Sequence, residues 1–85
     1  MSKYDLLGVS LKTIRKDAGY KSARAFYINV SKRENLSFNY SYYALIEQGK
    51  VLPSFKIIEE IGLLFSKNKC AEIILIYCRI IFPNH

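Results

Sequence analysis

The stretch from Tyr42 to Ser54 constrains this chain more than any other part of its 85 residues. It begins with a short apolar helical pattern that stops at Gly49, because glycine readily takes the left-handed backbone that closes a helix. Pro53 and Ser54 then open a second helix, with the serine as its cap. The stretch therefore predicts two helices joined by a basic turn at Lys50.

Apolar residues recur at intervals of three and four along most of the chain, which is typical of helices with one buried face. The periodicity predicts helices over about residues 4–18, 22–30, 40–48, 54–65 and 69–82. Residues 31–39 are polar and are expected to form a loop, whose start is able to extend the preceding helix. No strand pattern competes, so the predicted fold class is all-α with five helices.

Length and charge narrow the possibilities further. A chain of 85 residues has room for one small domain, here predicted as residues 1–85, with a four-helix core at 1–66 and a C-terminal apolar helix at 69–82. The net charge is +6, and residues 1–50 hold nine Lys or Arg against four acids. This excess of positive charge favours nucleic acid as a partner, although an acidic protein partner would match it equally well.

The sequence offers little for catalysis, metals or membranes. Cys70 and Cys78 would lie about 12 Å apart along one helix, too far for a disulfide, and the single His stands at residue 85. We therefore expect no enzyme activity, no metal site and no cofactor. The apolar run at 73–76 is much shorter than the roughly 20 residues of a membrane span, and no signal peptide opens the chain. A cytoplasmic protein is the simplest expectation.

A second glycine-terminated segment lies about thirty residues before the first. It carries Arg-x-x-x-Gly at residues 15–19, and the later segment carries Ile-Glu-x-Gly-Lys at 46–50 followed by Pro-Ser at 53–54. In this order and spacing, the motifs resemble the phage-repressor helix-turn-helix family (Cro-type, XRE) over about residues 11–65. The resemblance implies a lambda-repressor-like fold, here with about six extra residues between the second and third helices.

The resemblance also implies a structural ion pair. In the family, an arginine near the end of the first helix pairs with a glutamate near the end of the recognition helix, and the matching residues here are Arg15 and Glu47. A guanidinium can hold a carboxylate with two parallel hydrogen bonds and so fix the angle between two helices. The alternative is two separate, solvated charges.

The family's recognition helix further implies a set of DNA contacts. Tyr40, Ser41, Ala44 and Leu45 match the base-facing positions, but none offers the two-point recognition of Gln, Asn or Arg. Such a surface can touch thymine methyl groups, or it can bind a protein. The complete predicted DNA-binding set is Lys21, Ser22, Lys32, Arg33, Asn39, Tyr40, Ser41, Ala44, Leu45 and Lys50.

Two members of that set, Lys32 and Arg33, belong to the predicted loop. From there they are able either to reach the DNA backbone or to block the groove. Lys21 and Ser22 precede a helix N-terminus, where free amides and the helix dipole favour a phosphate. Each of these residues also has a simpler interpretation as a solvated surface side chain.

The last helix is apolar on most of its circumference, and a small core cannot easily cover all of it. We expect it to form a homodimer contact or to dock onto another part of a longer protein; alternatively, it completes the core of the monomer. The predicted interface residues are Ile73, Ile74, Ile76, Tyr77, Ile80 and Ile81.

These observations favour a sequence-specific transcriptional regulator that binds double-stranded DNA as a dimer. The alternative is a protein-interaction module on the same fold, which would use the apolar recognition face or the C-terminal helix.

Overall fold

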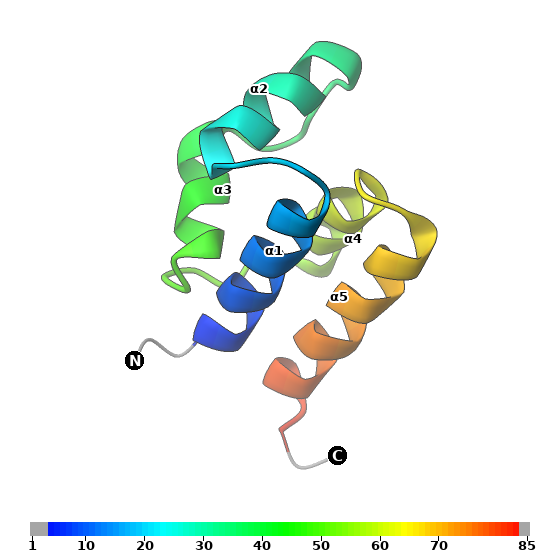
Figure 1. Cartoon of the computed structure of the whole chain (residues 1–85). Coiled ribbons are helices and arrows are strands. Elements are labelled where there is room, and N and C mark those ends of the chain that lie inside the picture. The colour runs from blue at the N-terminus through cyan, green and yellow to red at the C-terminus, as the bar shows by residue number, and fades with distance from the viewer. Residues whose placement is uncertain (1–3, 84–85) are drawn as a thin grey trace.

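A computed structural model describes residues 4–83; residues 1–3 and 84–85 of the predicted 1–85 domain lie outside the described part. The five helices are α1 (Asp5–Asp17), α2 (Ala23–Arg33), α3 (Tyr40–Glu47), α4 (Phe55–Leu63) and α5 (Lys67–Ile81) (Figure 1). No strand occurs among residues 4–83, so the all-α class is confirmed there. The radius of gyration of 12.0 Å is that of a compact chain of this size.

Local signals in the sequence explain where most helices begin and end. Four helices start after a capping side chain that accepts a hydrogen bond from the backbone N–H three residues later, which satisfies an otherwise free amide. These caps are Ser22, Asn39, Ser54 and Ser66. After α1 and α3, the chain turns at Gly19 and Gly49, whose φ angles of +98° and +73° suit glycine.

The second helix is longer than the predicted range of about 22–30. It continues through Lys32 and Arg33, and it ends where Glu34 takes extended backbone. No Gly or Pro interrupts this segment, and basic side chains in a last turn complement the helix dipole. The two cations therefore lie on the helical extension that the sequence left open at the start of residues 31–39, and the connecting segment begins at Glu34.

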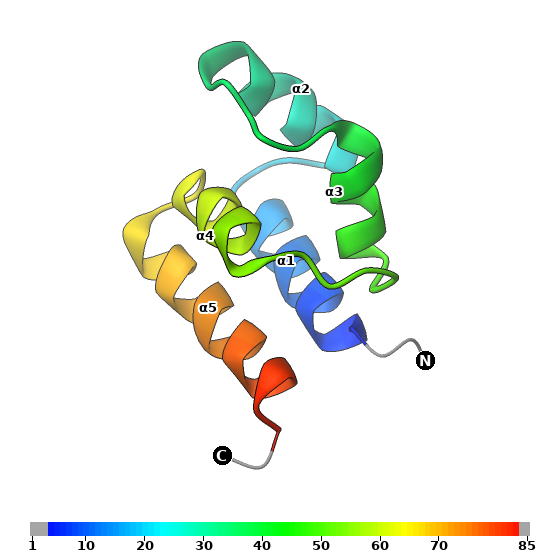
Figure 2. The same ribbon diagram turned by 180° about the vertical axis from the view of Figure 1, so that it is seen from behind.

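The segment between α2 and α3 runs back along α2 instead of turning directly into α3 (Figures 1 and 2). Tyr27 in the middle of α2 donates a hydrogen bond of 2.8 Å from its hydroxyl to the carbonyl of Phe38. The Phe38 side chain is buried in the core. As a result, α3 begins beside the N-terminal half of α2, and the last turn of α2 projects away from it.

The core lies between α1 and the other helices. It includes Leu7 and Leu11 of α1, together with Tyr43 of α3 and Ile61 of α4, which are fully buried. Phe26 of α2 stacks on Phe65, which follows α4, with ring centroids 4.8 Å apart. This cluster joins the α2–α3 pair to the α4–α5 hairpin.

Two glycines permit helices to approach closely. A Cβ atom at Gly8 of α1 would overlap the backbone carbonyl of Glu47 at the end of α3. A Cβ atom at Gly62 of α4 would lie 2.7 Å from the Cα atom of Cys70 in α5. Glycine therefore sets the spacing of both helix pairs.

The structure corrects part of the predicted dimer interface. Ile73 and Tyr77 are buried in the chain's own core, and the Tyr77 hydroxyl donates a 2.7 Å hydrogen bond to the carbonyl of Pro53. These two residues face α4 and α1, so their assignment to an interface with a second copy is wrong. The helix does complete the core, but only with one face.

The exposed apolar surface of α5 lies on its outer face at Leu75 and at the C-terminal end of the helix. Leu75 is 63% exposed, and Ile81 and Phe82 are 40% and 55% exposed. The other three predicted interface residues, Ile74, Ile76 and Ile80, are partly buried against the core.

Candidate nucleic-acid interface

The structure brings together the two residues that were predicted to pair. The Arg15 guanidinium donates from Nε to Oε2 of Glu47 at 2.8 Å and from Nη2 to Oε1 at 3.1 Å. The two side chains are only 5% and 4% exposed. Two parallel hydrogen bonds between planar groups fix both the distance and the angle between α1 and α3.

A third contact extends this arrangement to the turn after α1. Nη1 of Arg15 donates a 2.9 Å hydrogen bond to the carbonyl of Tyr20, just beyond Gly19. The guanidinium thus links the end of α1, the approach to α2 and the end of α3. This arrangement neutralises the Glu47 carboxylate inside the protein, where an unpaired charge is very unfavourable.

Tyr43 lies next to this ion pair and has no exposed surface. No described residue meets hydrogen-bond geometry with its hydroxyl. Burial raises the pKa of Tyr43, and the nearby negative charge of Glu47 raises it further. The phenol therefore stays protonated at neutral pH and acts as a core aromatic.

The ion pair leaves one side of α3 accessible. Ser41 and Gln48 are exposed, while Ala44 and Leu45 are half-buried. These four residues follow helical spacing along one face. Ser41, Ala44 and Leu45 belong to the predicted base-facing set, whereas Gln48, which follows Glu47 at the end of α3, does not.

Tyr40, the fourth predicted base-facing residue, lies beside Arg24, which was not among the predicted contacts. The Arg24 guanidinium lies over the Tyr40 ring, with its Cζ atom 5.2 Å from the ring centroid. The Tyr27 ring meets Tyr40 edge-on, with centroids 6.1 Å apart. The spacing of Arg24 and Tyr27 places them on one face of α2, but their meeting with Tyr40 depends on the returning loop.

The remaining predicted contacts divide into two groups. Lys21 and Ser22 come just before α2, at the end of that helix that is close to the start of α3. Lys50 follows α3. All three residues are exposed. Asn39 caps α3 by accepting a 2.8 Å hydrogen bond from the N–H of Tyr42. These residues surround the exposed face of α3.

Lys32 and Arg33 form the second group. They lie in the last turn of α2, about 13 Å along its axis from Arg24. The structure therefore separates them from the other predicted contacts.

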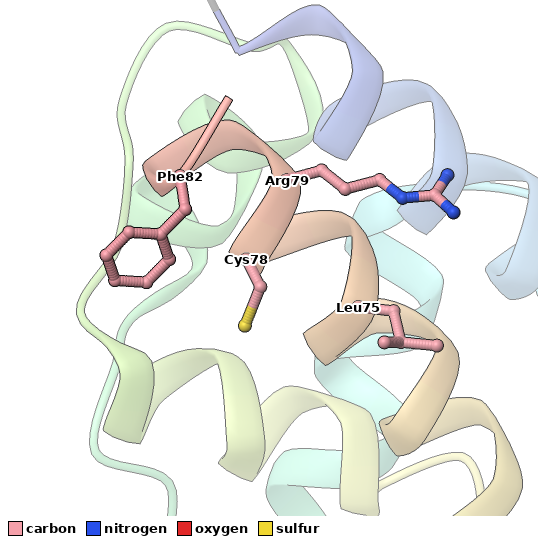
Figure 3. A pocket seen from close by; sticks show the side chains of 4 residues that line it. All are labelled: Leu75, Cys78, Arg79 and Phe82. Atoms are coloured by element: carbon pink, nitrogen blue, oxygen red, sulfur yellow. The ribbon is translucent and has the colours of Figure 1, made fainter. Parts of the chain in front are cut away.

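A shallow pocket occurs on the outer side of α5. It has a volume of about 410 Å³ and is lined by Leu75, Cys78, Arg79 and Phe82 (Figure 3). Cys78 and Phe82 point to one side of the helix, and Arg79 points away from them. The lining is mainly apolar and belongs to the exposed face of α5.

Residues 4–83 bring no three His, Cys, Asp or Glu side chains together as metal ligands. Within the same residues, no helix has the length and apolar character that crossing a membrane requires.

The fold is therefore all-α, and the short helix α3 is fixed to α1 by the buried Arg15–Glu47 ion pair, with its other side accessible. Comparisons with protein-family models, with curated proteins and with solved structures gave no match.

Proposed function

We propose that this protein is a sequence-specific, DNA-binding transcriptional regulator of the phage-repressor helix-turn-helix type. In this proposal α1 to α4 form the lambda-repressor-like unit, and α3 enters the major groove. The observation that carries the proposal is the two-point hydrogen bonding of Arg15 to Glu47, because it fixes α3 by its inner face and leaves the outer face free. The protein performs no chemistry and works in the cytoplasm.

The charge around α3 supports a polyanionic partner. The only acid in α3 is Glu47, whose carboxylate is buried and paired. From Tyr20 to Arg33 the chain contains no acid, and Lys21 and Arg24 stand at the end of α2 beside the start of α3. Lys50 adds a cation at the other end of α3. Cations at both ends suit the two phosphate backbones that border a major groove.

The outer face of α3 itself is small and mostly apolar. Ala44 and Leu45 are suited to contacts with thymine methyl groups, and the Ser41 hydroxyl can donate to or accept from a base edge. Gln48 adds an amide at the far end. Phosphate contacts position the protein, while this face supplies part of the sequence preference.

The regulator is proposed to act as a homodimer through the outer face of α5. Its exposed Leu75 stands between two charged residues, Glu72 and Arg79, which lie about two turns apart on the same side. If two copies of α5 pack antiparallel with the two-fold axis between Leu75 and Ile76, Glu72 of each copy faces Arg79 of the other. Such self-complementarity is what a two-fold interface requires.

Titration of labelled duplex DNA at two ionic strengths tests DNA binding. Affinity should fall by roughly 0.9 log units per phosphate contact for each log unit of salt. Lys21→Ala and Lys50→Ala should each reduce that slope and weaken binding to all sequences similarly. Lys67→Ala, at the exposed start of α5, is the matched control and should leave the slope unchanged. Duplex binding that does not respond to salt would refute the proposal.

A protein-interaction module on the same fold is the second candidate. It is favoured by exposed apolar residues on α1 and α5, where Leu6, Val9 and Leu75 are 55%, 57% and 63% exposed. A shallow groove of about 520 Å³ between these helices is lined by Val9 and Leu75 among others. If this function is correct, Leu75→Glu, which places a charge in the apolar contact, should abolish partner binding, while Lys21→Ala should have no effect.

A further inference from the structure

We propose that Arg24 reads a guanine in the DNA site, with its guanidinium positioned by the ring of Tyr40. This inference rests on the proposed DNA-binding function and adds a residue outside α3 that sets sequence preference. Arginine is the side chain that most often recognises guanine, because it donates to O6 and N7 together.

The need for such a residue follows from the composition of α3. The exposed face near the start of the helix carries Ser41 and Ala44, and neither can make two hydrogen bonds to one base edge in the way Arg, Asn or Gln can. Gln48 is able to do so, but it lies at the opposite end of α3. Helices of this class place their N-terminal residues against the bases. Asn39 stands at the start of α3, but its side-chain oxygen already accepts the capping hydrogen bond from the N–H of Tyr42. We therefore look for a two-point donor near the start of α3 on another element.

Arg24 meets this requirement in position. It lies in the first turn of α2, and its Cζ atom stands 5.2 Å from the centroid of Tyr40, the first residue of α3. Arg24 is exposed. Its charge is thus at the start of the proposed recognition helix even though it belongs to a different helix.

The donors of Arg24 are also available. Within residues 4–83, the ion pairs join Arg15 to Glu47 and Lys69 to Glu72, and no hydrogen bond engages the Arg24 guanidinium. A guanidinium that lies over an aromatic face keeps N–H groups at its edge for a planar acceptor. The contact with Tyr40 and pairing with guanine are therefore compatible.

The Tyr40 ring has a packing partner on α2. Its ring packs edge-on against Tyr27, with centroids 6.1 Å apart. The Tyr27 hydroxyl is itself fixed by its hydrogen bond to the carbonyl of Phe38. The lengthened loop thus brings the start of α3 next to α2, so that Tyr40 contacts both Arg24 and Tyr27. Restricting the rotamers of Arg24 before binding reduces the entropy lost on contact with DNA.

Selection of binding sites from a library of fully randomised duplexes tests the inference with the whole chain. The wild-type site should contain a fixed guanine. Arg24→Ala should reduce the preference for that guanine by about 5- to 150-fold and leave the other positions unchanged. Arg24→Gln should shift the preference at that position towards adenine, which glutamine recognises with two hydrogen bonds.

Matched variants separate this role from general charge or folding effects. Lys56→Ala removes one positive charge from the exposed start of α4, outside the predicted contact set, and should leave the selected site unchanged. Tyr40→Phe retains the ring face and should keep the guanine, whereas Tyr40→Leu should weaken the preference. Circular dichroism melts of the Arg24 variants should remain cooperative and lose only a small part of the wild-type stability, because Arg24 is exposed and gives up only its contact with Tyr40.

Two results would overturn the inference while leaving DNA binding intact. One is an Arg24→Ala variant that binds all sequences more weakly by the same factor, which identifies a phosphate contact. The other is a wild-type site without a fixed guanine, selected by a protein whose affinity still falls steeply with salt. If the wild-type chain binds no duplex, the proposed function is wrong, and the inference about Arg24 is wrong as well.

Discussion

Arg15 and Glu47 are 32 residues apart in the chain, yet their side chains meet through two hydrogen bonds of 2.8 and 3.1 Å in the interior. The pair joins the C-terminal ends of α1 and α3, and a third hydrogen bond from Arg15 reaches the carbonyl of Tyr20. The orientation of α3, and with it the proposed DNA-binding face, depends on this contact.

Breaking the pair on one side should destabilise the fold severely. Arg15→Met or Glu47→Gln leaves a charge that is buried without its partner, and we expect a loss of about 3–5 kcal/mol in the free energy of unfolding. That is a large part of the stability of a small domain. Urea denaturation followed by circular dichroism measures the loss.

The double variant Arg15→Met/Glu47→Met is the informative control. Both charges are removed together, so its stability should exceed that of either single variant. If the two single losses simply add in the double variant, the charges do not act as a pair. The exposed Lys69–Glu72 pair, at 3.2 Å, should contribute less than about 1 kcal/mol in the same experiment.

Tyr43 gives a prediction about alkaline pH. Burial, and then the charge of Glu47, raise the pKa of Tyr43 in the folded protein above its ordinary value of about 10. Above about pH 10 the unfolded chain loses this proton while the folded protein keeps it, so the unfolded state binds fewer protons. Stability is therefore fully present below that pH and falls as pH rises, with a slope approaching 1.4 kcal/mol per pH unit for one tyrosine.

Tyr43→Phe should remove this part of the alkaline loss. At neutral pH it should change stability by no more than about 1 kcal/mol, because the hydroxyl it deletes is buried beside Glu47 and meets hydrogen-bond geometry with no residue among 4–83. The test is urea unfolding of both proteins between about pH 8 and pH 11. If the free energy of unfolding falls equally with pH in both proteins, Tyr43 is not the group responsible for the alkaline loss. Tyr77→Phe is the contrasting variant, since it also loses the hydrogen bond to Pro53.

Gly8→Ala should destabilise the protein although alanine favours helices. In an exposed helix the change would add roughly 1 kcal/mol of stability. Here the new Cβ atom overlaps the Glu47 carbonyl, so α1 and α3 must separate, and we expect a net loss of about 1–3 kcal/mol. Thermal melting provides the measurement.

Gly19→Ala serves as a comparison for Gly8→Ala. A Cβ atom at Gly19 meets no atom within 4 Å, and its effect comes only from the strained φ of +98°.

Because Gly8 positions the backbone that carries Glu47, Gly8→Ala should also lower DNA affinity in proportion to the shift of α3. Unchanged stability of Gly8→Ala would mean that α1 and α3 are not in close contact there.

Local sequence signals were sufficient to predict the five helices. Ser22, Asn39 and Ser54 are caps that interact only with the next few residues, and Gly19 and Gly49 close turns through their own backbone. Such features can be read from a single segment of sequence. The Arg15–Glu47 pair could not be predicted from local signals, because it joins distant segments. It was expected only from the resemblance to a family.

Features that depend on packing between segments were not predictable in the same way. The Arg24–Tyr40 contact exists because residues 34–39 return along α2, and no local pattern specifies that path. Phe55 follows the helical spacing of buried residues, yet it is 48% exposed because it stands at the first position of α4. The assignment of Ile73 to an interface failed for a similar reason. A helix that is apolar all round does not reveal which face the core will cover.

The proposed homodimer predicts that Leu75→Glu yields a monomer. Leu75 is 63% exposed and lies next to the proposed two-fold axis, so a carboxylate there would face its copy in the second subunit without disturbing the monomer core. Sedimentation equilibrium should show a dimer for the wild type and a monomer for the variant, with unchanged helix content. Leu63→Glu, at a 55% exposed position on α4, is the control and should remain dimeric.

The charged residues that flank Leu75 provide a stricter test of the antiparallel arrangement. Glu72→Arg alone should weaken the dimer, because it places two cations opposite each other, and Glu72→Arg/Arg79→Glu should restore it. Loss of the dimer should reduce affinity for a two-fold DNA site much more than for a single half-site, since only the dimer engages both halves. A wild-type chain that sediments as a monomer at high concentration, or a charge swap that fails to restore association, would exclude this interface.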